Sequence, residues 1–151
     1  MAQFERQFTL QTPSSTEYLA MIRDFVGFIG DRAGMNEDER NMLALVVDEA
    51  CANVIEHSYG EDATKDVTVR ALLDEDTIQI NVIDNGKGFD PAAVQQKDLK
   101  TLVREGRSGG LGMRLMRKVM DEVKYEIVPG VKNELRMVKR LKKDQPPSPV
   151  H

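Results

Sequence analysis

Two neighbouring segments of the chain alternate apolar and polar side chains with a period of two. Their apolar positions are Val67, Val69, Ala71 and Leu73 in the first segment and Ile78, Ile80 and Val82 in the second. The turn sequence Asp74-Glu75-Asp76 separates them, so the pattern predicts an antiparallel hairpin with one covered face. A Rossmann fold is disfavoured, because its parallel strands are joined by crossover helices.

Further strands and helices are expected on both sides of this hairpin. Strands are predicted at 3–10, 123–128 and 135–141, and helices at about 18–33, 37–57 and 111–123. Two capping boxes, Ser14 with Glu17 and Asn36 with Glu39, mark the starts of the first two helices. Helices on one face of a mainly antiparallel mixed sheet form a two-layer α/β sandwich of the α+β class.

Length, charge and cysteine content limit the functional classes. The 151 residues predict one domain at 1–142, followed by a disordered proline-rich tail at 143–151. Its 25 acidic and 21 basic residues give a net charge of −4, which argues against direct nucleic-acid binding. The single cysteine, Cys51, suits a reducing, cytoplasmic compartment. No apolar run reaches the length of a signal peptide or a membrane span, so no membrane association is expected.

The long helix predicted at 37–57 is apolar on nearly every side between Met42 and Ile55, so it is expected to be largely buried. Among its polar exceptions, Glu49, Asn53 and His57 follow one another at intervals of four and share a stripe. A buried carboxylate and amide need a partner, a metal or a cavity. An amide oxygen beside a carboxylate suits Mg²⁺ with substrate phosphates. The stripe alone is equally typical of a solvated helix face.

Glycines crowd into the segment 86–112, which holds six of the eleven. A first set belongs to the run Asp84-Asn85-Gly86-Lys87-Gly88, directly after a predicted strand. Glycines at alternate positions let a ligand approach the backbone closely. Taken alone, the same run is also a strong turn signal.

The second set opens a predicted helix in the run Gly106-Arg107-Ser108-Gly109-Gly110-Leu111-Gly112. Free backbone N–H groups and the positive end of the helix dipole form a phosphate site there. Arg107 could add charge beside a terminal phosphate. The run is not a Walker A loop, because no Gly-Lys-Ser or Gly-Lys-Thr closes it. A flexible connection would have the same composition.

In this order, the three motifs resemble the Bergerat-type (GHKL) ATP-binding fold shared by gyrase, histidine-kinase and MutL ATPases. Residues 48–59, DEACANVIEHSY, are similar to the corresponding motif of the anti-sigma-factor serine/threonine kinases, the switch-protein kinases of Gram-positive stress and sporulation control. The resemblance extends from about Phe4 to about Leu141. It implies a histidine-kinase-like ATPase fold, ATP and Mg²⁺ as cofactors, and protein serine/threonine kinase activity.

The resemblance also implies roles for individual residues. Glu49 would be the catalytic general base, Asn53 would hold Mg²⁺, and Asp84 would bind the adenine amino group. Gly86 and Gly88 would lie at the adenine. The positions that would hold the phosphates are Arg107, Ser108, Gly109, Gly110, Leu111 and Gly112. Asn133 would also bind the cofactor, where it replaces the threonine usual in the family's last strand. Residues 91–106 would form the ATP lid.

By the same resemblance, the phosphate acceptor would be a STAS-type anti-anti-sigma protein. A sigma factor would be sequestered in the alternative state of this partner-switching pathway, which regulates transcription. A homodimer stays open, because relatives commonly work as dimers. Two other functions also stay open: an ATP-binding module that sequesters a partner without kinase activity, and a stand-alone histidine-kinase-type ATPase domain. Glu49 favours a kinase over the first. The lack of a preceding helical hairpin disfavours the second.

Overall fold

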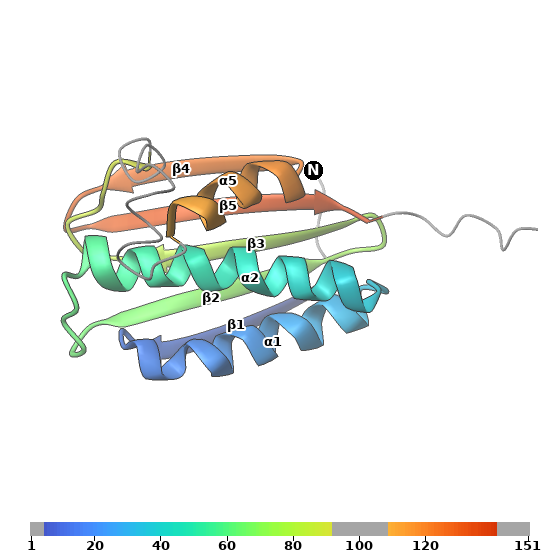
Figure 1. Cartoon of the computed structure of the whole chain (residues 1–151), viewed down its shortest axis with the longest axis horizontal. Helices are drawn as coiled ribbons and strands as arrows, with labels where there is room; N and C mark the ends of the chain where they lie inside the picture. Colours follow the sequence, from blue (N-terminus) through green and yellow to red (C-terminus); the bar gives the residue numbers. More distant parts are fainter. Residues whose placement is uncertain (1–4, 92–108, 142–151) are drawn as a thin grey trace, which may run out of the picture.

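An antiparallel sheet, covered on one face by helices, forms the framework of the fold (Figure 1). The computed structural model describes residues 5–91 and 109–141. The strands are β1 Arg6–Pro13, β2 Asp66–Leu73, β3 Thr77–Asp84, β4 Glu122–Val128 and β5 Lys132–Arg140. They lie in the order β1-β2-β3-β5-β4, with β1 at one edge. The expected α+β sandwich is confirmed. The pairings between these strands are all antiparallel, so the expected mixed pairing is not found among the described residues.

The helices α1 Leu19–Arg32, α2 Glu37–Asn53 and α5 Gly109–Val119 form the second layer, on the same side of the sheet (Figure 1). The core between the layers comes from both of them. Its fully buried members include Ile22, Val26 and Ile29 of α1, Leu43, Val46 and Val47 of α2, Met116 of α5, and Val69, Ile80 and Met137 of the sheet. Every apolar position of the period-two pattern in β2 and β3 is buried, because these side chains point to the face of the hairpin that the helices cover.

The starts of the first two helices differ in their caps. At α2 the expected capping box is confirmed, because the Glu39 N–H donates to Asn36 Oδ1 at 2.8 Å and the Asn36 N–H donates to Glu39 Oε1 at 3.1 Å. The capping box expected at Ser14 is wrong. There the Glu17 N–H donates to Ser15 Oγ at 3.4 Å and opens a 3₁₀ turn ahead of α1, while Ser14 is buried.

The third helix is shorter than its apolar stripe predicts. It ends at Val119, and Val123 lies in β4 instead of on the helix. The Met120 N–H still donates to the carbonyl oxygen of Met116 at 2.9 Å, but the next N–H, that of Asp121, donates to Val138 of the sheet. The chain therefore leaves the helix because strand pairing takes over its hydrogen bonds.

The outer face of α2 is less buried than the sequence predicts. Met42 and Leu45 are 37% and 44% exposed, because the helices form one layer and their outer faces meet solvent. No helix in residues 5–91 and 109–141 has both the length and the apolar character that crossing a membrane requires. The tail expected at 143–151 lies outside the described residues.

Replacing Asn36 with alanine should lower the free energy of unfolding by about 1 kcal/mol, because the Glu39 N–H at the start of α2 loses its side-chain acceptor. Asn41→Ala is the matched control, since Asn41 lies exposed within the same helix. Urea unfolding followed by circular dichroism measures both. Equal stability of the two variants would show that the capping box contributes nothing.

Candidate functional site

The C-terminal end of α2 does not stop as an ordinary helix. Its α-helical part ends at Asn53, and one π-helical turn, Val54–Ser58, continues it. A π turn contains more residues than an α turn, and such turns are frequent at functional sites. Here it brings Ser58 and Tyr59 against the end of β3.

Asp84, the last residue of β3, is held by three hydrogen bonds that all end on its Oδ1. The Ser58 hydroxyl donates at 2.6 Å, the Gly86 N–H at 2.9 Å and the Asn133 Nδ2 at 2.9 Å. Asp84, Ser58 and Asn133 are all buried. A carboxylate tolerates such burial only when donors replace water. These three donors, from three separate elements, therefore fix the carboxylate in one orientation.

The turn after Asp84 passes so close to Ser58 that it requires glycine. A Cβ atom on Gly86 would collide with Ser58 Oγ and lie only 2.6 Å from the Ser58 carbonyl oxygen. Gly88 has a positive φ of +75°, and a Cβ there would lie 2.7 Å from Cγ2 of Ile127. Both glycines of this first set are thus explained by close approach, and Gly88 also by its backbone conformation.

Tyr59 holds the other side of the same turn. Its hydroxyl oxygen lies 2.7 Å from the carbonyl oxygen of Asp66 and 2.9 Å from Oδ1 of Asn85. It also accepts the Asn85 N–H at 3.0 Å. The turn is therefore anchored to the residues after α2 by side chains as well as by backbone.

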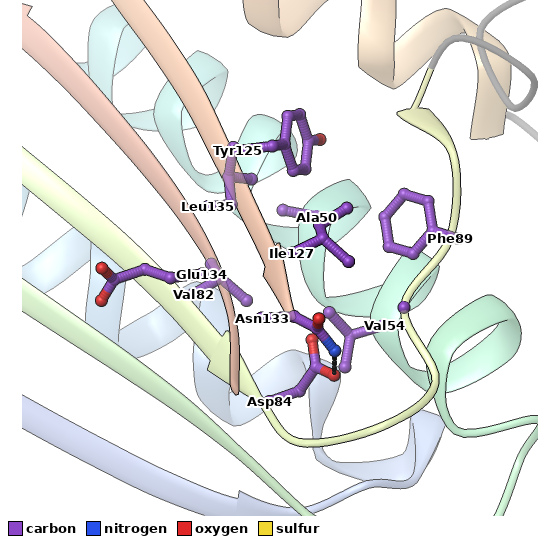
Figure 2. A pocket seen from close by; sticks show the side chains of 11 residues that line it. Ala50, Val54, Val82, Asp84, Phe89, Tyr125, Ile127, Asn133, Glu134 and Leu135 are labelled. Carbon is purple, nitrogen blue, oxygen red and sulfur yellow. Dashed lines mark hydrogen bonds between the residues drawn. The ribbon is translucent and has the colours of Figure 1, made fainter. Parts of the chain in front are cut away.

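A pocket opens between the end of α2, the Asp84 turn and the last two strands (Figure 2). Its walls are mostly apolar and include Ala50, Val54, Phe89, Tyr125 and Ile127. The rings of Phe89 and Tyr125 pack edge to face, with centroids 6.2 Å apart. The polar corner of the pocket consists of Asp84 and Asn133, which Figure 2 shows joined by a hydrogen bond. Apolar walls with a small polar corner are typical of small-molecule and cofactor sites.

Glu49 and Asn53 each lie one residue before a pocket-lining residue, Ala50 of α2 and Val54 of the π turn. Both are buried, at 5% and 2% exposure. Oε1 of Glu49 and Nδ2 of Asn53 have no hydrogen-bond partner among the residues that the structure describes. Buried polar atoms are rarely left unpaired, so these two atoms need a partner from outside the described residues.

Burial also changes the chemistry of Glu49. It raises the pKa of the Glu49 carboxyl from 4.5 to about 7, and the neighbouring charge of Asp48 adds to this effect. Burial raises the pKa of the pocket residue Tyr125 as well, and among the charges acting on it that of Arg117 lowers its pKa while that of Glu49 raises it. Glu49 is thus electrostatically coupled to the pocket wall, with a pKa suited to a general base near neutral pH.

The structure brings together Asp84, Gly86, Gly88 and Asn133 of the predicted site residues. Glu49 and Asn53 lie buried on α2, and the charge of Glu49 acts on Tyr125 of the pocket wall. The second glycine set is described in part. Its positions Gly109, Gly110, Leu111 and Gly112 form the first turn of α5, as the sequence predicts for a helix start. Arg107, Ser108 and the expected lid beyond Pro91 lie outside the described residues.

Sequence reasoning missed the role of Ser58 and the apolar walls of the pocket. Ser58 follows Asn53 by five residues, a spacing that leaves the shared face of an α-helix but not of a π turn. Phe89, Tyr125 and Ile127 carry ordinary apolar patterns in their segments. For Ser58 the sequence did contain a signal, because it is a small polar residue directly before Tyr59 in a run already similar to a nucleotide-binding motif.

Gly86→Ala should lower the free energy of unfolding by about 2 kcal/mol or more, because the added methyl group meets Ser58 and forces the turn away from Asp84. Gly27→Ala is the matched control. Nothing lies within 4 Å of a Cβ at Gly27 inside α1, so this variant should gain about 0.5–1 kcal/mol. Thermal unfolding of both variants checks the difference, and similar stabilities would contradict the close approach.

Comparison with known proteins identifies the family to which the chain belongs. The sequence profile of the histidine kinase-like ATPase domain matches residues 12–139. The serine-protein kinase RsbW of Bacillus licheniformis is 36% identical over 127 residues, covering 81% of this chain and 79% of the relative. The RsbW of Listeria monocytogenes serovar 1/2a is 33% identical over 135 residues, covering 87% and 86%.

A solved structure shares the fold at low sequence identity. A chain from the SiaB–SiaC complex of Pseudomonas aeruginosa superposes with a TM-score of 0.62 at 16% identity, covering 87% of this chain and 88% of that chain. The profile match spans most of the chain, and the RsbW relatives exceed 30% identity over more than two thirds of it. The chain belongs to the histidine kinase-like ATPase family.

Proposed function

We propose that this chain is an ATP-dependent protein serine/threonine kinase that also acts as an anti-sigma factor. The observation that carries the proposal is the combination of an apolar pocket with a fixed carboxylate at Asp84 and, nearby on α2, a buried Glu49 whose Oε1 has no partner among the described residues. Membership in the ATPase family supports ATP as the phosphoryl donor. Relatives named serine-protein kinase support a protein hydroxyl as the acceptor.

In the proposed complex, the adenine ring lies between the apolar walls and its amino group faces Asp84. Gly88 lines the pocket, where a side chain would meet Ile127, and Gly86 lets the turn that carries Asp84 pass close to Ser58. The phosphates lie at the N-terminus of α5, where free backbone N–H groups favour anions. The residues proposed to hold them are Arg107, Ser108, Gly109, Gly110, Leu111 and Gly112.

The residues at the end of α2 fit a Mg²⁺ ion. Asn53 is almost completely buried, and within the described part of the chain its side-chain amide makes no hydrogen bond, so the amide oxygen is available to a cation. We propose that its amide oxygen holds the ion, in agreement with the preference of Mg²⁺ for few protein oxygen ligands together with phosphates. When bound, Mg²⁺ supplies positive charge that neutralises the phosphate oxygens during transfer.

Glu49 acts as the general base. Its carboxylate accepts the proton of the incoming serine or threonine hydroxyl as the hydroxyl oxygen forms a bond to the γ-phosphorus. The bond between the γ-phosphorus and the bridging oxygen breaks, and its electron pair stays on ADP. Because the pKa of Glu49 is about 7, its carboxyl group becomes ionised, and thus able to accept a proton, as the pH rises through neutrality.

The partners belong to the same proposal. We take the phosphate acceptor to be a STAS-type anti-anti-sigma protein and the sequestered partner to be a sigma factor, as the resemblance of residues 48–59 implies. A homodimer and a cytoplasmic location are part of the same proposal. The kinase is favoured over a pure binding module because Glu49 carries an unpaired, basic carboxylate that binding alone would not require.

The test is to incubate the chain with ATP, Mg²⁺ and a STAS-type protein encoded beside it, and to search that protein for phosphoserine or phosphothreonine by mass spectrometry. Glu49→Gln should reduce phosphotransfer by about 100-fold or more while ATP affinity stays within about threefold, because only the proton acceptor is lost. Glu75→Gln, in an exposed turn, is the matched control and should keep full activity. Unchanged phosphotransfer in Glu49→Gln would remove Glu49 from the mechanism.

The raised pKa of Glu49 also predicts a pH-dependent stability. A carboxyl whose folded pKa is about 7 and whose usual pKa is 4.5 stabilises the fold below pH 4.5, and this contribution is lost as pH rises through about 7. Relative to wild type, Glu49→Gln should therefore gain stability with rising pH. The gain should reach about 1–2 kcal/mol near pH 8, after allowing for partial screening by solvent.

Urea unfolding at several pH values measures this difference, with Glu75→Gln as the control that should follow wild type. If Glu49→Gln and wild type keep a constant difference from about pH 5 to about pH 8, the pKa of Glu49 is not raised in the folded chain.

A further inference from the structure

Two exposed apolar side chains lie on the same side of α2 as Glu49. Met42 and Leu45 precede Glu49 by seven and four residues, a spacing that places all three on one stripe of a helix. At a rise of about 1.5 Å per residue, they lie about 10 Å and about 6 Å from Glu49 along the helix axis. Met42 is 37% exposed and Leu45 is 44% exposed, whereas Glu49 is only 5% exposed. The stripe therefore leads from solvent to the proposed general base.

Packing within the fold does not account for Met42 and Leu45. They belong neither to the hydrophobic core nor to the partly buried side chains that pack against it. Single exposed apolar side chains are normal on a protein surface. What distinguishes these two is their position, because both lie in line with the residue at which the acceptor hydroxyl must arrive.

The helix beside α2 adds positive charge to this region. α5 packs against α2 (Figure 1), and its Arg114 and Lys118 are exposed and four residues apart, so they share one face. Neither forms an ion pair with another described residue, although the whole chain has a net charge of −4. An apolar stripe with cations beside it fits a partner surface that is apolar at its centre and acidic at its rim.

The size of protein interfaces also favours contact with this region. The acceptor hydroxyl must come within hydrogen-bond distance of the Glu49 carboxylate. A specific protein–protein interface covers about 800 Å² on each partner, which corresponds to a patch roughly 30 Å wide. An interface of this width around Glu49 reaches side chains that lie within about 10 Å of it along α2.

We propose that Met42 and Leu45 of α2, together with Arg114 and Lys118 of α5, form the surface on which the phosphate acceptor protein docks. The apolar pair holds the centre of the acceptor's surface, and the two cations orient its acidic rim during approach. The acceptor serine or threonine lies at the edge of this contact, next to Glu49. The inference rests on the proposed function, because it takes the docked protein to be the one that is phosphorylated.

The experiment measures the affinity of the full chain for the STAS-type protein encoded beside it by calorimetry, and the KM and kcat of phosphotransfer to that protein. Leu45→Glu should weaken the affinity and raise KM about tenfold or more, because a charge replaces an apolar contact and repels an acidic rim. Saturating acceptor should restore most of the rate, since Glu49 is unchanged. Met42→Gln is a milder second variant and should weaken the affinity about threefold.

Met21→Glu is the matched control for these variants. Met21 is 50% exposed, but it lies on α1 and outside the stripe of Glu49, so this variant should keep the wild-type affinity and KM. Circular dichroism checks that each variant keeps the wild-type fold, which is expected because the replaced side chains are exposed.

The two cations are tested by salt dependence. Lys118→Gln should weaken acceptor binding about threefold to fivefold at low salt, and its difference from wild type should shrink as ionic strength rises, because salt screens exposed charges. Lys124→Gln, on the exposed strand β4, is the control and should follow wild type. If Lys118→Gln binds the acceptor as wild type does at low salt, the cations of α5 are not part of the surface.

The outcomes separate this inference from the proposed function. If wild type phosphorylates the acceptor but Leu45→Glu keeps its affinity and KM, or loses no more than Met21→Glu does, the inference alone is overturned. If wild type binds the acceptor without phosphate transfer, the kinase proposal falls, while a loss of affinity in Leu45→Glu still supports the docking surface. If wild type neither binds nor phosphorylates the acceptor, both fall.

A different occupant of the surface would also be detected. Sedimentation of the chain without acceptor should give the same oligomeric state for wild type and Leu45→Glu. If Leu45→Glu separates a dimer that wild type forms, the surface holds a second copy of the chain and the inference is overturned. It is overturned as well if Leu45→Glu weakens binding of a sigma factor but leaves binding of the acceptor unchanged.

Discussion

Three donors converge on a single carboxylate oxygen of Asp84, and the arrangement of the pocket depends on that convergence. The donors belong to the turn after α2, to the loop after β3 and to β5, so one buried carboxylate joins three segments that are distant in sequence. Each donor offsets part of the cost of removing the charge from water. Close contact with Ser58 then requires glycine at position 86. The polar corner of the pocket is thereby formed by the protein's own hydrogen bonds.

Two buried carboxylates in this region have opposite environments, and their chemistry differs accordingly. Asp84 is surrounded by donors, whereas Glu49 lies on α2 with Oε1 unpaired among the described residues and a pKa raised to about 7. Different surroundings of this kind separate the roles of paired carboxylates. The first carboxylate is suited to hold a ligand in place, and the second to accept a proton. The fold therefore buries one carboxyl group without full pairing, at the position where the proposed reaction requires a proton acceptor.

Sequence patterns predicted the fold well where burial alone decides the structure. The period-two alternation of β2 and β3 and the capping box at Asn36 follow from local rules, and the structure confirms both. Local rules failed where tertiary contacts decide. Val123 joins a strand because hydrogen bonds to β5 replace those of the helix, and Leu45 is exposed because no second helical layer covers it. For the site, the motifs identified Asp84 and the glycines, but Ser58 could not be placed without the π turn.

The π turn at Val54–Ser58 makes the site sensitive to the number of residues as well as to their identity. Each residue of an α-helix advances by about 100° around the axis. Loss of one residue from this turn would restore regular helical winding and rotate Ser58 away from Asp84, whatever side chains remained. Substitutions in this segment can be compensated by neighbours, but a change in its length shifts the register of everything after it. Natural variation here should thus be found in side chains and not in spacing.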